Sequence, residues 1–151
     1  MTDLARLADR LAIEDLNAAF AFHLDHGEIE PLVALFTEDA VYTNGARRSE
    51  GRAEIEAFFR ARTAAGPRTS RHLMTGLRIR FESDTRAKGT SVWLSFAANG
   101  VPPIENCEPF MVADFIDHYA RGDDGVWRIA RRHIEPVFRN PAIPPPGARQ
   151  S

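Results

Sequence analysis

The spacing of apolar residues changes once along this chain, and that change limits the folds it can adopt. Up to about residue 64, apolar residues recur every three or four positions, which predicts helices over 2–26, 31–36 and 52–63. A short strand is expected between them, over 39–43. Farther on, apolar residues alternate with others in four strand-like segments: 72–81, 91–98, 109–119 and 125–134. Helices followed by neighbouring strands predict an α+β fold with a mainly antiparallel sheet.

The first predicted helix carries two apolar stripes on nearly opposite sides. One consists of Leu4, Leu7, Leu11, Ala18 and Phe22, and the other of Ile13, Leu16, Phe20 and Leu24. A helix that is apolar on two sides is expected to be buried between other elements.

Length and composition exclude several classes of protein. At 151 residues, with 44% hydrophobic and 26% charged residues, the chain fits one globular domain, and we expect it over 1–138 with a proline-rich arm over 139–151. The net charge of −2 and the lack of a basic block argue against nucleic-acid binding. No apolar run approaches the ~20 residues of a membrane helix, and the N-terminus lacks a signal-peptide core, so a cytoplasmic protein is expected. A single cysteine, Cys107, excludes an intrachain disulfide and a multi-cysteine metal site.

Asp25 and His72 are the first candidates for chemistry. Asp25 continues an apolar stripe and lies in the last turn of its helix, where the helix dipole disfavours a negative charge. His72 opens a strand on the side of Met74 and Gly76, away from Leu73, and a carboxylate could orient its imidazole. The plainer interpretations are a helix-end carboxylate in solvent and a surface histidine.

Three further sets of residues could belong to a functional site. Arg132 alternates with Arg128 and Ala130 on the last strand and could hold an anion, unless it is a solvated edge charge. His23 and His26 are three residues apart on the first helix, but no accompanying motif supports a metal site, and none is predicted. One strand face is expected to carry Met111, Ala113, Phe115, Asp117 and Tyr119.

In this order and spacing, the segments LADRLAIEDL, LDHGEIEPLVALFTEDAVY, GRAEIEAF, RHLMTGLRI and DGVWRIARR resemble the SnoaL-like branch of the NTF2-like superfamily over about residues 2–138. The chain looks most like its scytalone dehydratase and hexachlorocyclohexane dehydrochlorinase group. That resemblance implies a cone of N-terminal helices packed on a curved sheet around a cavity. It also implies an Asp–His dyad that works without metal or organic cofactor, and a homotrimer.

Carried over by the resemblance, the dyad is Asp25 and His72, and Arg132 matches a cavity arginine of the dehydrochlorinase. The cavity is then expected to be lined by Phe22, Tyr42, Trp93, Ser95, Met111, Ala113, Phe115, Asp117 and Tyr119. The dehydrochlorinase has a lysine where this chain has Phe20, and scytalone dehydratase has a tyrosine where it has Leu24. The reaction class therefore transfers better than the substrate.

These observations favour a cofactor-independent lyase acting on a hydrophobic, aromatic or cyclic small molecule. The reaction would be dehydration or a retro-aldol loss of a small aldehyde, with His72 as base, Asp25 orienting it and Arg132 steadying the departing group or oxyanion. Two alternatives stay open: an isomerase or polyketide cyclase that shuttles a proton, and a module that binds a ligand without catalysis.

Overall fold

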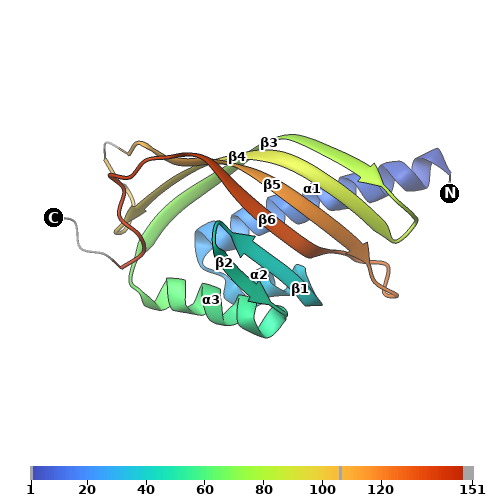
Figure 1. Cartoon of the computed structure of the whole chain (residues 1–151), viewed down its shortest axis with the longest axis horizontal. Coiled ribbons are helices and arrows are strands. Elements are labelled where there is room, and N and C mark those ends of the chain that lie inside the picture. The colour runs from blue at the N-terminus through green and yellow to red at the C-terminus, as the bar shows by residue number, and fades with distance from the viewer. Residues whose placement is uncertain (1, 106, 148–151) are drawn as a thin grey trace.

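The computed structural model describes residues 2–105 and 107–147 of the chain (Figure 1). Its helices are α1 (Asp3–His26), α2 (Ile29–Ala34) and α3 (Arg52–Ala64). The strands are β1 (Phe36–Asn44), β2 (Arg47–Glu50), β3 (Arg68–Phe81), β4 (Arg86–Asn99), β5 (Pro109–Arg121) and β6 (Trp127–Arg139). No helix in this part of the chain is long and apolar enough to cross a membrane.

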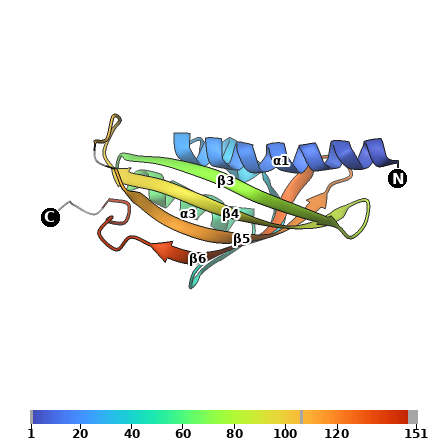
Figure 2. The ribbon, with the colours of Figure 1, turned by 90° about the horizontal axis from the view of Figure 1, so that it is seen from above.

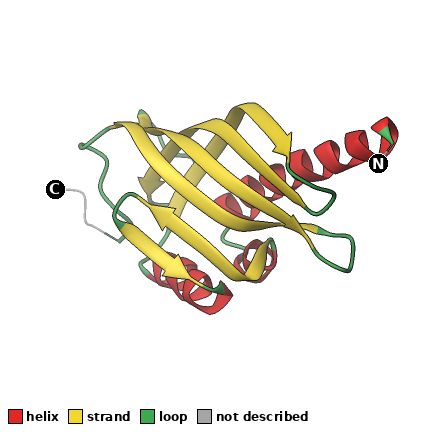
Figure 3. Cartoon of the chain, turned by 45° about the vertical axis from the view of Figure 1, so that its right-hand side comes forward, coloured by secondary structure: helices red, strands yellow, loops and turns green. Residues whose placement is uncertain are grey.

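The strands form one six-stranded sheet in the order β2-β1-β6-β5-β4-β3. All neighbours are antiparallel except β1 and β6, which run parallel. The long strands curve, and α1 lies along the sheet (Figure 2), while α2 and α3 lie beside the short strands (Figure 3). The predicted α+β class, with helices on a curved and mainly antiparallel sheet, is confirmed.

Helix α1 begins where the Thr2 hydroxyl accepts a hydrogen bond from the backbone N–H of Ala5, and ends at Gly27, whose φ is 68°. It buries only one of its two apolar stripes, that of Ile13, Leu16 and Phe20. The expectation that both would be covered is wrong for the single chain, because only one side of the helix faces the sheet. The uncovered stripe includes Leu4, Leu7, Leu11 and Phe22, each at least half exposed.

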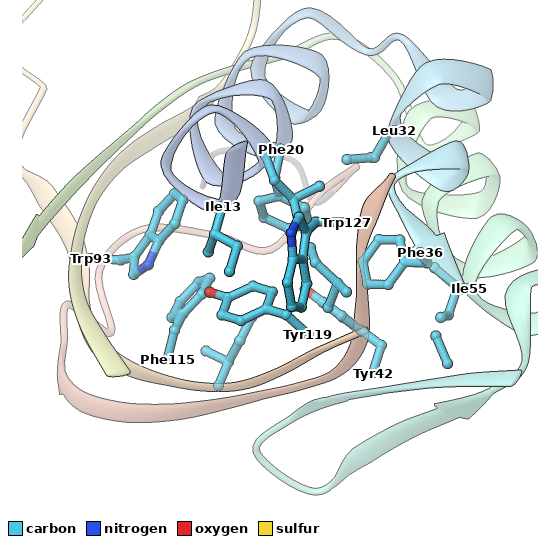
Figure 4. Packing of buried hydrophobic residues seen from close by; sticks show 14 of the residues in the cluster. Ile13, Phe20, Leu32, Phe36, Tyr42, Ile55, Trp93, Phe115, Tyr119 and Trp127 are labelled. Carbon is cyan, nitrogen blue, oxygen red and sulfur yellow. The ribbon is translucent and has the colours of Figure 1, made fainter. Parts of the chain in front are cut away.

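The core fills the space between α1 and the concave face of the sheet (Figure 4). Phe20 meets Trp93 edge to face, with ring centroids 6.0 Å apart, and Trp93 stacks on Phe115 at 4.5 Å. At the other end, the indole N–H of Trp127 donates to the buried Asp9 at 2.9 Å and ties the start of α1 to β6. The ring cluster thus fixes how the helix sits in the sheet.

Two bulges change which side chains face the core. His118 of β5 pairs with Arg131 of β6, but the next residue of β5, Tyr119, pairs with Ile129. Ala130 is therefore an extra residue on β6. The expected separation of Arg132 from the face of Trp127 and Ile129 is therefore wrong: all three are buried on the same side.

On β3, an extra residue lies between Thr75 and Arg78, next to Gly76 with φ 63°. This extra residue places Leu77, Ile79 and Phe81 on the same face of β3 as His72. Strict alternation along the strand would place them on the other face. Leu73 stays on the outer face, half exposed.

The remaining differences concern short elements. Helix α2 begins at Ile29, with Pro31 inside its first turn, and β1 begins at Phe36, three residues before the expected 39–43. Strand β2 was not expected, because its residues, RRSE, contain no apolar side chain to mark it.

Candidate active site

A pocket of about 430 Å³ opens between the sheet, α1 and α3, a size typical of small-molecule sites. Its walls are mainly aromatic and apolar. The lining residues are Phe20, Leu24, Tyr42, Asn44, Arg47, Phe58, Phe59, Ala61, Arg62, Ala65, Arg68, His72, Trp93, Ser95, Ala97, Phe110, Met111, Phe115, Ile134 and Pro146.

Asp25 and His72 meet at this pocket. The ring nitrogen Nδ1 of His72 lies 2.6 Å from Oδ1 of Asp25, and the backbone N–H of His72 donates to Oδ2 at 2.8 Å. The Ser70 hydroxyl donates to Oδ1, also at 2.8 Å. With Nδ1 bonded to the carboxylate, the neutral imidazole carries its proton there and leaves Nε2 as an acceptor. The pair can therefore supply a base to the pocket.

Neighbouring groups stabilise the charged form of Asp25 in the last turn of α1. Burial raises the pKa of Asp25, but the hydrogen bonds and charge of His72 and the Ser70 hydroxyl outweigh burial, and the pKa ends below its usual value. The side chains of Asp25 and His72 are 5% and 14% exposed. The dyad is thus largely shielded from water and held in one arrangement.

Arg132 lies behind the pocket wall rather than among its lining residues. Its Nε and Nη2 atoms donate to Asp117 at 2.9 and 2.8 Å, and Nη2 also donates to Asn17. Burial lowers the pKa of Arg132, but the charge and hydrogen bonds of Asp117, together with the nearby Tyr119 and Tyr42, outweigh burial, and the pKa ends above its usual value. Its guanidinium packs over Phe20 and Phe115, which line the pocket. Asp117 neutralises this arginine inside the core.

Of the other residues expected to contact substrate, Tyr42, Trp93, Ser95, Met111 and Phe115 line the pocket. Three are buried on the expected strand face but do not line it: Ala113, Asp117 and Tyr119. The Tyr119 hydroxyl instead donates to Asp117 at 2.8 Å and accepts from Asn17 at 3.0 Å.

The expectation for Phe22 is wrong. Its ring stacks on His26 at 4.1 Å outside the pocket, because it belongs to the stripe of α1 that the sheet does not cover.

Each histidine of the first helix uses its ring nitrogen Nδ1 in a hydrogen bond within the fold. His23 bonds to Glu28 at 2.7 Å, and His26 bonds to the backbone carbonyl of Phe22 at 2.7 Å. Within residues 2–105 and 107–147, no three His, Cys, Asp or Glu side chains are grouped to hold a metal ion.

Sequence reasoning missed the three arginines of the pocket, Arg47, Arg62 and Arg68. One signal was available for Arg62. It follows Ile55 and Phe59, both buried, at helical spacing, so a charge interrupts the inward side of α3.

The arm also reaches the pocket. After β6, residues 140–147 return to the sheet, where Arg68 and Asn99 donate to the carbonyls of Pro144 and Pro145 at 3.1 and 2.9 Å. Pro146 then lines the pocket. Gly147 passes so close to α3 that a methyl group there would come 2.7 Å from the carbonyl oxygen of Ala65. Residues 148–151 of the predicted arm lie outside the described residues.

The chain thus combines an α+β fold of helices on a curved sheet with a histidine–carboxylate pair whose histidine lines an aromatic pocket. Residues 5–133 match the SnoaL-like domain family. The chain belongs to this family.

Solved structures share the fold. A putative scytalone dehydratase from Novosphingobium aromaticivorans is 23% identical, over 98% of this chain and 99% of its own, with a TM-score of 0.79. LinA is 26% identical, over 96% and 100%, with a TM-score of 0.79. Hexachlorocyclohexane dehydrochlorinase LinA-type3 from Novosphingobium barchaimii is 23% identical, over 92% and 93%, with a TM-score of 0.77. No curated protein shows significant sequence similarity to the chain.

Proposed function

We propose that this protein is a cofactor-independent lyase that eliminates water from a hydrophobic aromatic or cyclic small molecule. The observation that carries the proposal is the bond between Asp25 and His72, which leaves one imidazole nitrogen available at an aromatic pocket. Similarity to the structures of a putative scytalone dehydratase and a hexachlorocyclohexane dehydrochlorinase supports an elimination.

In the proposed reaction, Nε2 of His72 takes a proton from the carbon next to the one that bears a hydroxyl group. The electron pair of that C–H bond forms the C=C bond, the C–O bond breaks, and the imidazolium returns the proton to the departing hydroxyl as water. Asp25 stabilises the imidazolium in between, and a base positioned in this way contributes about 10²–10⁴-fold.

Arg132 enters this mechanism as a positioning residue. It is bound to Asp117 and packs behind Phe20 and Phe115, so it supports the wall against which a substrate ring would lie. Among the described lining residues, Tyr42 and Asn44 offer neutral donors to a leaving group or oxyanion, while the Ser95 hydroxyl donates to the Met111 carbonyl at 3.4 Å.

The test is to incubate the purified protein with aromatic and cyclic alcohols and diols and to follow product mass. Loss of 18 mass units supports dehydration. Loss of a small aldehyde points to retro-aldol cleavage, and an unchanged mass with a new chromatographic peak points to isomerisation or cyclisation. Full turnover by both His72→Asn and Asp25→Asn on an accepted substrate would show that this mechanism is wrong.

A further inference from the structure

The charged side chains around the pocket have one sign. Three arginines line it, Arg47 and Arg62 on β2 and α3 and Arg68 on β3. No aspartate or glutamate appears among the described lining residues. The carboxylate of Asp25 is bound to the ring and the backbone N–H of His72.

Two of these arginines already have partners in the fold. The guanidinium of Arg47 packs over the ring of Phe58 at 4.4 Å. Arg68 donates to Asn99 at 2.8 Å and to the carbonyl of Pro144 at 3.1 Å, and thereby holds the arm. Both guanidinium groups are therefore engaged in contacts within the fold.

Arg62 is different, because within the described part of the chain it has no hydrogen-bond acceptor and no ion pair. It borders both the pocket and a smaller cavity on whose wall Asp25 lies. The oxygens of Asp25 already accept three hydrogen bonds, from Ser70 and from the backbone and ring of His72. The guanidinium of Arg62 therefore reaches the pocket with its donors uncommitted to the described residues, and an anion in the pocket would supply an acceptor and a counter-charge for it.

Tyr42 packs against Phe58 and Phe59 of α3, the helix that carries Arg62. Burial lowers the pKa of Arg62, while the nearby Tyr42 and Asp25 act in the opposite direction. Burial also raises the pKa of Tyr42, so its hydroxyl stays protonated at neutral pH and can donate. Arg62 and Tyr42 thus give the lining of the pocket one charged and one neutral donor.

We propose that the pocket binds an aromatic small molecule with a carboxylate group, which Arg62 holds while the ring lies among the aromatic side chains and near His72. This inference rests on the proposed function, whose substrate class it names. A planar guanidinium suits a carboxylate because it can donate two parallel hydrogen bonds.

The test compares the binding of three acids, benzoate, 3-phenylpropanoate and 4-hydroxycinnamate, with that of their primary amides by isothermal titration calorimetry. Each amide keeps the ring and removes the charge. We expect at least one acid to bind roughly 10- to 100-fold more tightly than its amide, the range for a hydrogen bond to a charged group. If none of the acids binds the wild-type protein more tightly than its amide does, the proposal is overturned. This outcome does not depend on any variant.

Variants then assign the preference to one residue. Arg62→Gln should abolish it, and Arg62→Lys should keep part of it. The matched control is Arg60→Gln, on the same helix, where the arginine pairs with Glu56 in solvent; this variant should keep the full preference. A preference that persists in Arg62→Gln contradicts the proposal.

Because the readout is binding, the two proposals fail separately. Acid preference without turnover of any substrate contradicts the lyase and leaves the carboxylate site standing. Turnover of neutral alcohols with no acid preference contradicts only the carboxylate site.

Discussion

His72 binds Asp25 twice, through ring nitrogen Nδ1 at 2.6 Å and through its own backbone N–H at 2.8 Å. The carboxylate on α1 thereby holds both the backbone of β3 at His72 and the imidazole ring of this residue. Movement of α1 relative to β3 would break both bonds together. The orientation of the imidazole is thus linked to the packing of the helix on the sheet.

The first prediction concerns catalysis. Replacing His72 with asparagine removes the proposed base and should lower kcat by about 10²–10⁴-fold on any substrate the protein turns over. The control is His118→Asn. His118 lies on β5, on the face that points away from the pocket, so this variant should retain activity. Thermal melts of both variants check that each one folds.

The second prediction concerns the pH dependence of stability. The pKa of Asp25 is lower in the folded protein than its usual value, so the unfolded chain binds this proton more tightly. The stabilisation from Asp25 is complete above the unfolded pKa of about 3.9 and is lost as pH falls through the lower folded value. Urea unfolding between about pH 6 and pH 3 should show a shallower decline for Asp25→Asn than for wild type. An equally shallow decline for Asp15→Asn, at an exposed site of α1, would contradict this assignment.

The third prediction concerns the buried ion pair. Both Asp117 and Arg132 are fully buried, so Asp117→Asn leaves an uncompensated charge in the core. The free energy of unfolding should fall by about 3–5 kcal/mol. Asp114→Asn, on the exposed face of the same strand, should change it by about 0.5 kcal/mol or less. Urea denaturation of the two variants measures the difference, and similar values would contradict the role of the pair.

The fourth prediction concerns Gly89, whose position a larger residue cannot occupy without displacing a ring. A methyl group there would come 2.8 Å from the ring of Tyr119, whose hydroxyl bonds to Asn17 and Asp117. Gly89→Ala should therefore cost about 1–3 kcal/mol. Thr90→Ala, one residue along the strand with its side chain exposed, gives the comparison, and equal thermal stability of the two would exclude the predicted clash.

The fifth prediction concerns assembly. A homotrimer is expected from the family resemblance, and the exposed Leu4, Leu7 and Leu11 of α1 offer an apolar surface for it. Replacing Leu7 and Leu11 with glutamate should reduce the molar mass measured by light scattering after gel filtration. A wild-type mass of one chain would rule the homo-oligomer out.

The sequence predicted the long elements because periods of two and of three to four residues are strong signals there. It did not predict β2, which has no apolar residue, nor the bulges beside Gly76 and Ala130. A bulge adds a residue without changing the local composition, so period counting assigned Arg132 to the wrong face. Asp25 was detectable because a carboxylate interrupts an apolar stripe at a helix end. Arg62 interrupts a stripe in the same way, but arginine is common on solvated helix faces and gave a weaker signal.

The bulge at Ala130 separates two regions of one strand. Before it, Trp127 and Ile129 close the core, and beyond it Ile134 faces the pocket. The neighbouring strands divide in the same way: Ala87 and Tyr119 lie in packed interior, while Ser95 and Met111 line the pocket. Closed packing therefore dominates one end of these strands and the pocket the other, while Trp93 and Phe115 belong to both. A substitution at Ser95 or Met111 should therefore change the shape of the pocket with less effect on folding than one at Ala87 or Tyr119.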